Sequence, residues 1–265
     1  MSNLTRSIGI KAAKEAGGFL MENLYKIHAV KYKEDSSKVT EIDLKSNEII
    51  INIIKSKFPD HKIISEESGK EEDKIIGNGP TWIIDPLDGT SNYIVKLPLF
   101  AVAIAFINNS ETQLGIIYDP KGDEMFVAEK GKGSTLNNEP INTSDRVLTR
   151  GGMLFAGRGH KQKDRDKHAT IICNLEKETS YFRRLGSAAI MLASVAAGRA
   201  DSVILSGAKS WDTAAGALLV KEAGGKVTDY CGNKWGHKSP DLVATNKHIH
   251  DQLINITKGL AEECL

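Results

Sequence analysis

The chain has 265 residues, which allows one large unit or two closely packed units. Its formal net charge is only +1 at pH 7, and 26% of its residues are charged. Nucleic-acid-binding proteins usually carry a basic excess, so this balance predicts no nucleic-acid partner. No apolar run approaches the roughly 18–20 residues that span a bilayer, and the N-terminus lacks the pattern of an export signal. We therefore expect a soluble, cytoplasmic protein with no membrane partner.

The N-terminal half, residues 1–148, is expected to contain two helices followed by a sheet. Apolar residues recur every four positions over roughly the first 25 residues, which predicts an amphipathic helix. Thr40 and Asp43 resemble a helix-capping pair and predict a second helix that ends near Phe58. Residues 31–38 would form the loop between these helices. Short apolar runs between turn residues predict strands at 62–65, 81–84, 100–108, 113–118 and 124–128.

The C-terminal half, residues 149–265, shows alternating strand and helix patterns. Strands are predicted at 153–156, 181–183, 202–205 and 226–229, and helices at 164–175, 187–197, 212–223 and from about 248 onward. The stretch 159–167 carries charges of both signs and predicts a solvated loop before a helix. No linker is long enough to separate the two halves, so we expect them to share a cleft.

Acidic residues stand at the ends of three predicted elements. Strand 81–84 runs into Asp85–Thr90 (DPLDGT), where two carboxylates three residues apart can converge on one Mg²⁺, a cation that prefers oxygen ligands. Glu66 and Glu67 follow strand 62–65, and Asp212 begins a helix. Singly, these acids are typical of a turn, a solvated loop or a helix N-cap. Together they indicate a two-metal phosphoryl-transfer site.

The same segment carries a pattern that suits a phosphate group. Gly89 lets the backbone approach a ligand closely. Thr90 and Ser91 would form the first turn of a helix, and the free N–H groups of a first turn favour an anion. The metal and phosphate sites would therefore adjoin.

Five segments, in sequence order, resemble the motifs of the inositol monophosphatase superfamily. Three of them resemble the family's metal motifs: Glu66–Ser68, Asp85–Thr90 and Trp211–Gly216. Lys33–Asp43 resembles the family's mobile N-terminal loop, and Arg183–Ala189 resembles its substrate segment. The resemblance spans nearly the whole chain. It implies a layered α/β fold, the αβαβα sandwich of the sugar phosphatase and fructose-1,6-bisphosphatase type, with the active site in the cleft between the halves. It also implies a Mg²⁺-dependent phosphatase that forms a homodimer.

The resemblance further implies a role for individual residues. Catalytic roles would fall to Glu66, Thr90 and Asp43, of which Glu66 and Thr90 help to position and deprotonate the attacking water. Two Mg²⁺ ions would be held by Glu66, Asp85, the Leu87 carbonyl, Asp88 and Asp212, and Asp43 would support a weaker third ion. Substrate contacts would come from Asp88, Gly89, Thr90, Ser91, Arg183, Gly186, Ser187, Ala188 and Asp212.

The substrate is ranked from the same motifs: inositol 1-phosphate first, fructose 1,6-bisphosphate or a dual sugar-phosphate activity second, and a 3′(2′),5′-bisphosphate nucleotide third. Seven residues before Asp212, where inositol phosphatases usually carry a glutamate, the chain has Leu205, which accepts no hydrogen bond. An alternative of another class is a non-catalytic regulatory protein on the same fold. The complete set of acids argues against that alternative.

Overall fold

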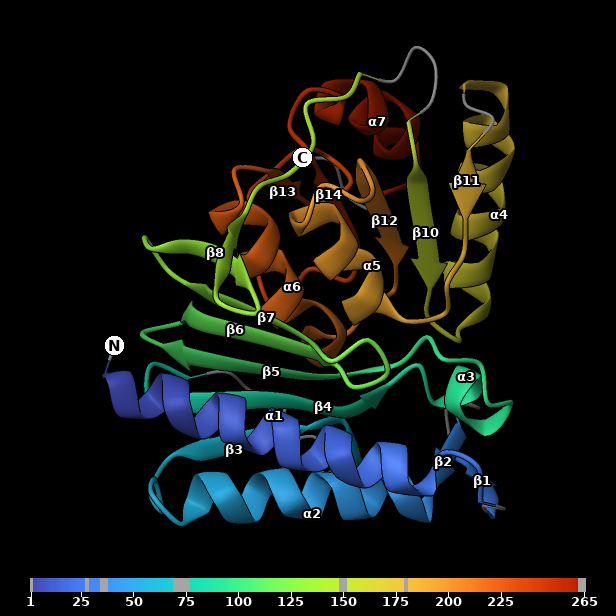
Figure 1. The fold of residues 1–265 in the computed structure, drawn as a ribbon. Helices are drawn as coiled ribbons and strands as arrows, with labels where there is room; N and C mark the ends of the chain where they lie inside the picture. The colour runs from blue at the N-terminus through green and yellow to red at the C-terminus, as the bar shows by residue number, and fades with distance from the viewer. Residues whose placement is uncertain are drawn as a thin grey trace.

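The computed structural model, described over residues 2–26, 29–33, 38–68, 77–147, 152–178 and 181–261, stacks its elements in five layers (Figure 1). Helices α1 and α2 cover one face of a seven-stranded sheet. Helices α5 and α6 lie between this sheet and a five-stranded sheet, whose other face is covered by α4 and α7. The predicted αβαβα fold class is therefore confirmed.

The first layer contains α1 (Asn3–Asn23) and α2 (Glu41–Lys55). Both helices agree with the sequence prediction, and α2 begins with the expected capping box between Thr40 and Asp43. The predicted loop at 31–38 is wrong in its described part, because β1 (Val30–Tyr32) and β2 (Lys38–Thr40) pair as antiparallel strands. Residues 34–37 of that prediction lie outside the described residues.

The seven-stranded sheet has the order β3-β4-β5-β6-β7-β8-β9, with β3 parallel to β4 and the other pairs antiparallel. Its strands are β3 (Lys62–Ser65), β4 (Thr81–Asp88), β5 (Ala101–Asn108), β6 (Glu111–Asp119), β7 (Glu124–Glu129), β8 (Gly133–Leu136) and β9 (Glu139–Ile141). A short 3₁₀ helix (Glu66–Ser68) follows β3, and α3 (Thr90–Ile94) follows β4.

Strand β4 is longer than predicted and brings two acids into the interior. Its pairing with β5 shifts register between Asp85 and Asp88, where Pro86 has no N–H to donate to the ladder. All eight residues of β4 are buried, since helices cover both faces of the sheet. The strand therefore carries Asp85 and Asp88 out of water.

The five-stranded sheet has the order β11-β10-β12-β14-β13. Strands β10, β11 and β12 run parallel, and β14 pairs antiparallel with both of its neighbours. The elements of this part are β10 (Leu154–Arg158), α4 (Gln162–Glu178), β11 (Phe182–Arg183), α5 (Ala188–Ala196), β12 (Ser202–Ser206), α6 (Ser210–Glu222), β13 (Lys226–Thr228), β14 (Leu242–Thr245), α7 (His250–Thr257) and a 3₁₀ helix (Lys258–Leu260). Strand β14 was not predicted.

Small residues let the central helices approach the first sheet closely. A Cβ at Gly115 of β6 would lie 2.5 Å from the Ala215 carbonyl oxygen of α6, and one at Gly216 would lie 2.5 Å from Leu192 Cβ of α5. This packing holds the N-terminal ends of α5 and α6 beside the end of β4. Each sheet lies within one of the two predicted halves, and their assignment as separate domains stays a prediction.

No helix of the described ranges is both long enough and apolar enough to cross a membrane.

Candidate active site

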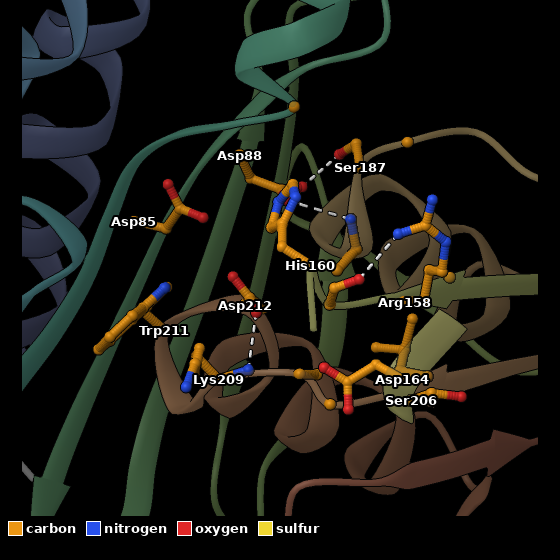
Figure 2. A pocket seen from close by; sticks show the side chains of 18 of the residues that line it. Asp85, Asp88, Arg158, His160, Asp164, Ser187, Ser206, Lys209, Trp211 and Asp212 are labelled. Atoms are coloured by element: carbon orange, nitrogen blue, oxygen red, sulfur yellow. Dashed lines mark hydrogen bonds between the residues drawn. The ribbon is translucent and has the colours of Figure 1, made fainter. Parts of the chain in front are cut away.

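A pocket of about 360 Å³ opens where the end of β4 meets the N-terminal ends of α5 and α6 (Figure 2). The segments that follow β10, β11 and β12 form its remaining wall. Residues from both predicted halves therefore line it. The acids in its lining are Glu66, Asp85, Asp88, Asp164 and Asp212.

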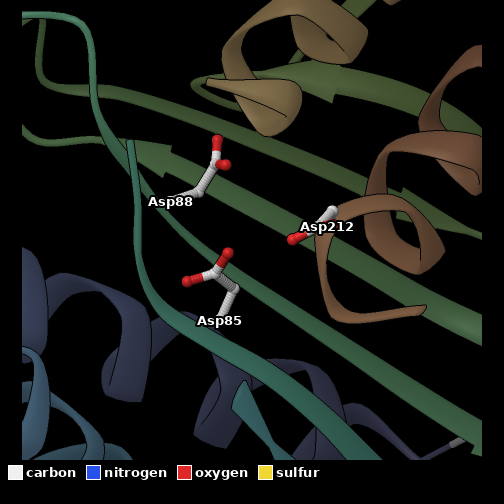
Figure 3. Close-up of side chains that lie close together, drawn as sticks. All are labelled: Asp85, Asp88 and Asp212. Atoms are coloured by element: carbon white, nitrogen blue, oxygen red, sulfur yellow. The ribbon is translucent and has the colours of Figure 1, made fainter. Parts of the chain in front are cut away.

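Three of these acids converge on one point. Asp85, Asp88 and Asp212 each offer a carboxylate oxygen, and these oxygens all lie within 4.8 Å of one another (Figure 3). Burial, and then the negative charge of Glu66, raise the pKa of Asp212 to about 8 and that of Asp85 well above its usual value. Burial raises the pKa of Asp88 to about 6. A divalent cation would remove this repulsion, so the donor set fits Mg²⁺.

The N-terminal end of α5 holds Asp88 in place. Its carboxylate accepts hydrogen bonds from Ser187 Oγ, from the Ala188 N–H at 3.2 Å and from the Ala189 N–H at 2.8 Å. A helix N-terminus favours an anion, and here the anion is the carboxylate of Asp88, from β4 of the seven-stranded sheet. Ser187 and Ala188, which are predicted to contact substrate, both line the pocket. The Ser187 hydroxyl and the Ala188 N–H are hydrogen-bonded to Asp88.

Backbone N–H groups orient the other two aspartates. The Leu87 N–H donates to Asp85 Oδ1 at 3.1 Å, within the same turn. The Lys209 N–H donates to Asp212 Oδ2 at 2.7 Å, because Asp212 is the third residue of α6 and its side chain reaches back to the backbone of the N-cap residue. Each carboxylate keeps a second oxygen that can face the pocket.

Asp43 and Thr90 form a hydrogen-bonded pair at the pocket edge. Asp43 Oδ2 accepts from the Thr40 N–H at 2.8 Å and from Thr40 Oγ1 at 2.7 Å, and Oδ1 accepts from Thr90 Oγ1 at 2.9 Å. Thr90 Oγ1 also lies 3.1 Å from the Leu87 carbonyl oxygen. Burial raises the pKa of Asp43. Thr90 lines the pocket, and buried Asp43 reaches it through Thr90.

Glu66 lies at the start of the 3₁₀ helix after β3 and lines the pocket beside Asp85. Lys33 Nζ lies 2.8 Å from Glu66 Oε1 and 2.7 Å from Glu67 Oε1. Burial raises the pKa of Glu67 to about 7. Sequence reasoning did not pair Lys33 with these acids, since they are far apart along the chain and no local pattern links them.

Two glycines of the predicted substrate set have backbones that favour glycine. Gly89 has φ of +90°, and a Cβ there would lie 2.8 Å from the Leu99 carbonyl oxygen. Gly186 has φ of +76°, and a Cβ there would lie 3.2 Å from the Asn92 amide. Both glycines line the pocket, as does Ser91. The chain can therefore turn sharply at both edges of the site.

Arg183 lies outside the pocket lining, whereas Leu205 belongs to it. Arg183 is exposed on β11 and donates to the neighbouring Phe182 carbonyl, and it is not among the residues that line the pocket. The next residue, Arg184, does line it. Leu205 is buried on β12 opposite Gly157 of β10, with its side chain in the pocket lining. The predicted substrate role of Arg183 stays a prediction.

The predicted solvated loop at 159–167 is correct for residues 159–161, which precede a helix, and wrong beyond them. Helix α4 already begins at Gln162, and His160, Lys161 and Lys163 line the pocket. Asp164 is only 4% exposed and packs against Gly207. The local charge pattern is typical of a protein surface. The stretch lines the pocket because it follows the C-terminal end of β10, a parallel strand.

The model of the inositol monophosphatase family matches residues 3–261. Two curated relatives, both named Nus factor SuhB, are similar over most of their length. The protein from Pasteurella multocida is 38% identical over 94% of both chains, and that from Escherichia coli K12 is 39% identical over 92% of this chain and 91% of its own.

Solved structures agree with the same family. Extragenic suppressor protein suhB from Bartonella henselae superposes with a TM-score of 0.90 and 33% identity, covering 97% of this chain and 99% of its own. An IMPase from Thermotoga maritima superposes with a TM-score of 0.86 and 34% identity over 98% of both chains.

Proposed function

The chain belongs to the inositol monophosphatase family, and on this basis we propose that it is a Mg²⁺-dependent phosphatase. Its substrates would be phosphate monoesters of small polyols and sugars, inositol 1-phosphate among them. The observation that carries the proposal is the convergence of Asp85, Asp88 and Asp212 within 4.8 Å in a pocket next to the Gly89 turn. Hard cations and a phosphate group would then meet at one place.

The residues that would hold Mg²⁺ are Glu66, Asp85, the Leu87 carbonyl, Asp88 and Asp212, with Asp43 near a third ion. When bound, two or three ions would neutralise phosphate oxygens, lower the pKa of a water molecule and stabilise the leaving alkoxide. No covalent protein nucleophile is required for this chemistry. The donors are carboxylate and carbonyl oxygens, which suit Mg²⁺ rather than a soft metal.

Thr90 and Asp43 would move the proton of the attacking water. Thr90 Oγ1 donates to Asp43 Oδ1 at 2.9 Å, so its lone pairs are free to accept a proton from a water in the pocket. The raised pKa of Asp43, which burial causes, makes its carboxylate a better base than an exposed aspartate. Glu66, which also lines the pocket, would help to orient the same water.

The turn that begins α3 would bind the reacting phosphate. The first N–H groups of a helix have no partner within the helix, and the residues that begin α3, Gly89, Thr90 and Ser91, line the pocket. Gly186, Ser187 and Ala188 form the opposite edge, where the substrate hydroxyls would lie. Arg183 would contribute from outside this lining.

The proposal is tested by phosphate release from the purified protein, with Mg²⁺ and with a chelator. Inositol 1-phosphate, fructose 1,6-bisphosphate and 3′-phosphoadenosine 5′-phosphate are compared by kcat/KM. We expect release from at least one ester that disappears with chelator and returns with Mg²⁺. Release that persists in chelator contradicts the metal assignment, and no release from any ester favours a regulatory protein on the same fold.

The names of the relatives support a second proposal, that the chain also acts as a Nus factor. The expectation of no nucleic-acid partner therefore stays a prediction, as does the homodimer. Titration of labelled RNA and DNA with the chain, read by fluorescence anisotropy, tests whether the chain binds nucleic acid. Sedimentation equilibrium tests whether it forms a homodimer. An Asp88→Asn variant that binds nucleic acid normally but hydrolyses no ester would separate the two functions.

A further inference from the structure

Among the described residues that line the pocket, Asp164 is the one acid that the proposed mechanism does not use. The mechanism assigns the other acids of the lining to metal ions. Asp164 is the third residue of α4 and is only 4% exposed, although Lys163 and Arg165 on either side of it are exposed. Aspartate is almost never buried to this extent unless a partner compensates its charge. The burial of this carboxylate therefore needs a reason.

Two glycines make room for the Asp164 carboxylate. Gly159 follows β10, and a Cβ there would lie 2.7 Å from Asp164 Oδ2. Gly207 follows β12, and a Cβ there would overlap the carboxylate itself. Strands β10 and β12 are parallel neighbours and α4 packs on both, so both glycines lie at the edge of the sheet where α4 begins. The fold thus accommodates this carboxylate beside the pocket instead of leaving it in solvent.

In the part of the chain that the structure describes, no group donates a hydrogen bond to the Asp164 carboxylate. The N–H groups of the two glycines are engaged elsewhere: that of Gly207 donates to Asp241 Oδ1 at 3.0 Å, and that of Gly159 donates to the Ser206 carbonyl at 2.7 Å. A buried carboxylate without donors costs stability. Such a cost is typical of a side chain that is kept for a ligand.

The charges around Asp164 favour a neutral donor. Burial lowers the pKa of Arg158, which ends β10, and the nearby charge of Asp164 opposes that shift. Arg158 Nη1 donates to the Gly159 carbonyl at 2.9 Å, and Arg158 has no ion pair among the described residues. An amine or a metal ion would be repelled by Arg158, and a phosphate would lie beside the negative charge of Asp164. A hydroxyl group avoids both costs, because it can donate to the carboxylate and accept from the guanidinium.

Asp164 flanks the same segment that carries one of the clustered acids. Gly207 and Asp212 both belong to the connection from β12 into α6. Figure 2 shows Asp164 and Asp85 on different sides of the pocket. At about 360 Å³, the pocket has room for a single sugar or polyol between them. With the reacting phosphate at the acid cluster, the far hydroxyl groups of the same molecule would reach Asp164.

We propose that Asp164 is a substrate-specificity residue, which accepts a hydrogen bond from a hydroxyl group of the alcohol that carries the phosphate. Arg158 would donate to the oxygen of the same or the adjacent hydroxyl group. The inference rests on the proposed phosphatase function, and it assigns the choice of alcohol to the first turn of α4. A phosphate ester without hydroxyl groups would leave Asp164 buried and unpaired, so it should be a poor substrate.

The experiment compares phosphate esters that share a carbon skeleton and differ in their hydroxyl groups. The pairs are inositol 1-phosphate against cyclohexyl phosphate, and sorbitol 6-phosphate against hexyl phosphate, all with Mg²⁺. In at least one pair we expect kcat/KM to be about ten- to a hundredfold higher for the hydroxylated ester, mainly through a lower KM. This is the range for a hydrogen bond to a charged group.

Two substitutions of Asp164 locate the effect. Asp164→Ala should lower the ratio of kcat/KM, hydroxylated ester over plain ester, by about ten- to a hundredfold, and Asp164→Asn by about tenfold. Asp166→Asn is the matched control, because Asp166 is exposed on the same turn of α4 and does not line the pocket. It removes the same charge and should leave the ratio unchanged.

Urea unfolding separates substrate recognition from a purely structural role. If Asp164 is kept for a ligand, Asp164→Asn should not lower the unfolding midpoint, because the variant no longer buries an unpaired charge. A lower midpoint together with an unchanged ratio of kcat/KM would show that the carboxylate supports the fold, and it would overturn the proposal.

The failures of the two proposals are distinguishable. An unchanged ratio in Asp164→Ala for both pairs, or an equal change in Asp166→Asn, overturns the specificity role while the phosphatase function stands. No turnover of any ester overturns the phosphatase function. In that case calorimetric titration with inositol 1-phosphate and cyclohexyl phosphate, with Ca²⁺ present, still decides the role of Asp164. Tighter binding of inositol 1-phosphate that is lost in Asp164→Ala supports it, and equal binding refutes it.

Discussion

Asp88 belongs both to the cluster of acids and to the contact between β4 and α5. Its carboxylate lies with Asp85 and Asp212 on one side, and on the other it accepts hydrogen bonds from Ser187 and the first N–H groups of α5. Removing its charge should therefore affect the chemistry more than the fold, because an amide can replace part of the hydrogen bonding but cannot replace the charge.

For Asp88→Asn we expect loss of activity of about a hundredfold or more, since a carboxylate facing the proposed ions is removed. The free energy of unfolding should change by no more than about 2 kcal/mol, because the repulsion with the other aspartates falls as one hydrogen bond weakens. Phosphate release and urea unfolding measure the two effects. Asp60→Asn, at an exposed position, is the control, and full activity in Asp88→Asn would refute the metal assignment.

Gly89 provides a second test at the level of a single residue. A methyl group there would lie 2.8 Å from the Leu99 carbonyl oxygen, on a backbone with φ of +90°. Gly89→Ala should therefore lose about 2 kcal/mol of stability and most of the activity. Gly18→Ala is the matched control, since Gly18 lies in α1 with open space around it and should gain about 0.5–1 kcal/mol. Equal stability of the two variants would contradict the role of the Gly89 turn.

At the scale of elements, the N-terminal end of α5 connects the two sheets. Ser187 is the N-cap of this helix, and its Oγ accepts from the Ile190 N–H at 3.2 Å while it donates to Asp88. The helix therefore binds a carboxylate of β4 at the point where its dipole is positive. A substitution of the N-cap residue Ser187 should therefore change the position of Asp88 and, through it, the geometry of the acid cluster.

Ser187→Ala should cost about 1 kcal/mol of stability through loss of the cap and lower kcat by about tenfold through loss of the hydrogen bond to Asp88. Ser2→Ala removes the N-cap of α1, whose Oγ accepts from the Thr5 N–H at 3.2 Å far from the pocket. It should have a comparable effect on thermal unfolding and none on kcat. A similar kcat in both variants would show that the cap does not position Asp88.

At the scale of the whole molecule, the acids that converge in the pocket come from both parts of the chain. Asp85 and Asp88 end a strand of the seven-stranded sheet, and Asp212 begins a helix packed between the two sheets. A cation bound to all three would connect the elements of the two halves. Metal binding should therefore raise the stability of the molecule as a unit.

This stabilisation should increase with pH. Burial raises the pKa of Asp88 to about 6 and that of Asp212 to about 8, both from 3.8, so the metal-free folded chain binds more protons than the unfolded chain. Without metal, the contribution of these groups to stability is complete below pH 4 and is lost as pH rises through 6 to 8. Mg²⁺ competes with those protons.

The measurement is the thermal unfolding midpoint with Mg²⁺ and with chelator, at pH 5.5 and pH 8. At about a hundredfold excess over the dissociation constant, Mg²⁺ should stabilise by about 2.7 kcal/mol, or roughly 5–10 °C, at pH 8. The shift should be smaller at pH 5.5 and nearly absent in Asp212→Asn. A shift that is equal at the two pH values would contradict a site made of these aspartates.

Local patterns were sufficient for most elements. The four-residue apolar spacing predicted α1, the Thr40 and Asp43 pair predicted the start of α2, and strand β3 was predicted with its observed bounds. Local patterns failed where neighbours decide the structure. Strand β14 is stabilised by pairing with β12 and β13 on its two sides. Strand β4 continues past Pro86 because its pairing with β5 resumes at Asp88 after a shift in register.

Asp85, Asp88 and Asp212 were predictable as a cluster of acids from the sequence, because carboxylates at the ends of apolar elements are a local pattern. The partners of the acids depend on how distant segments pack together. Ser187 and Asp88 are 99 residues apart, and Lys33 and Glu66 are 33 apart. The parallel pairing of β10 with β11 likewise brings the ends of two strands that are distant in sequence to one edge of the sheet. Periodicity and spacing report only near neighbours along the chain, whereas packing selects which distant ends share a pocket.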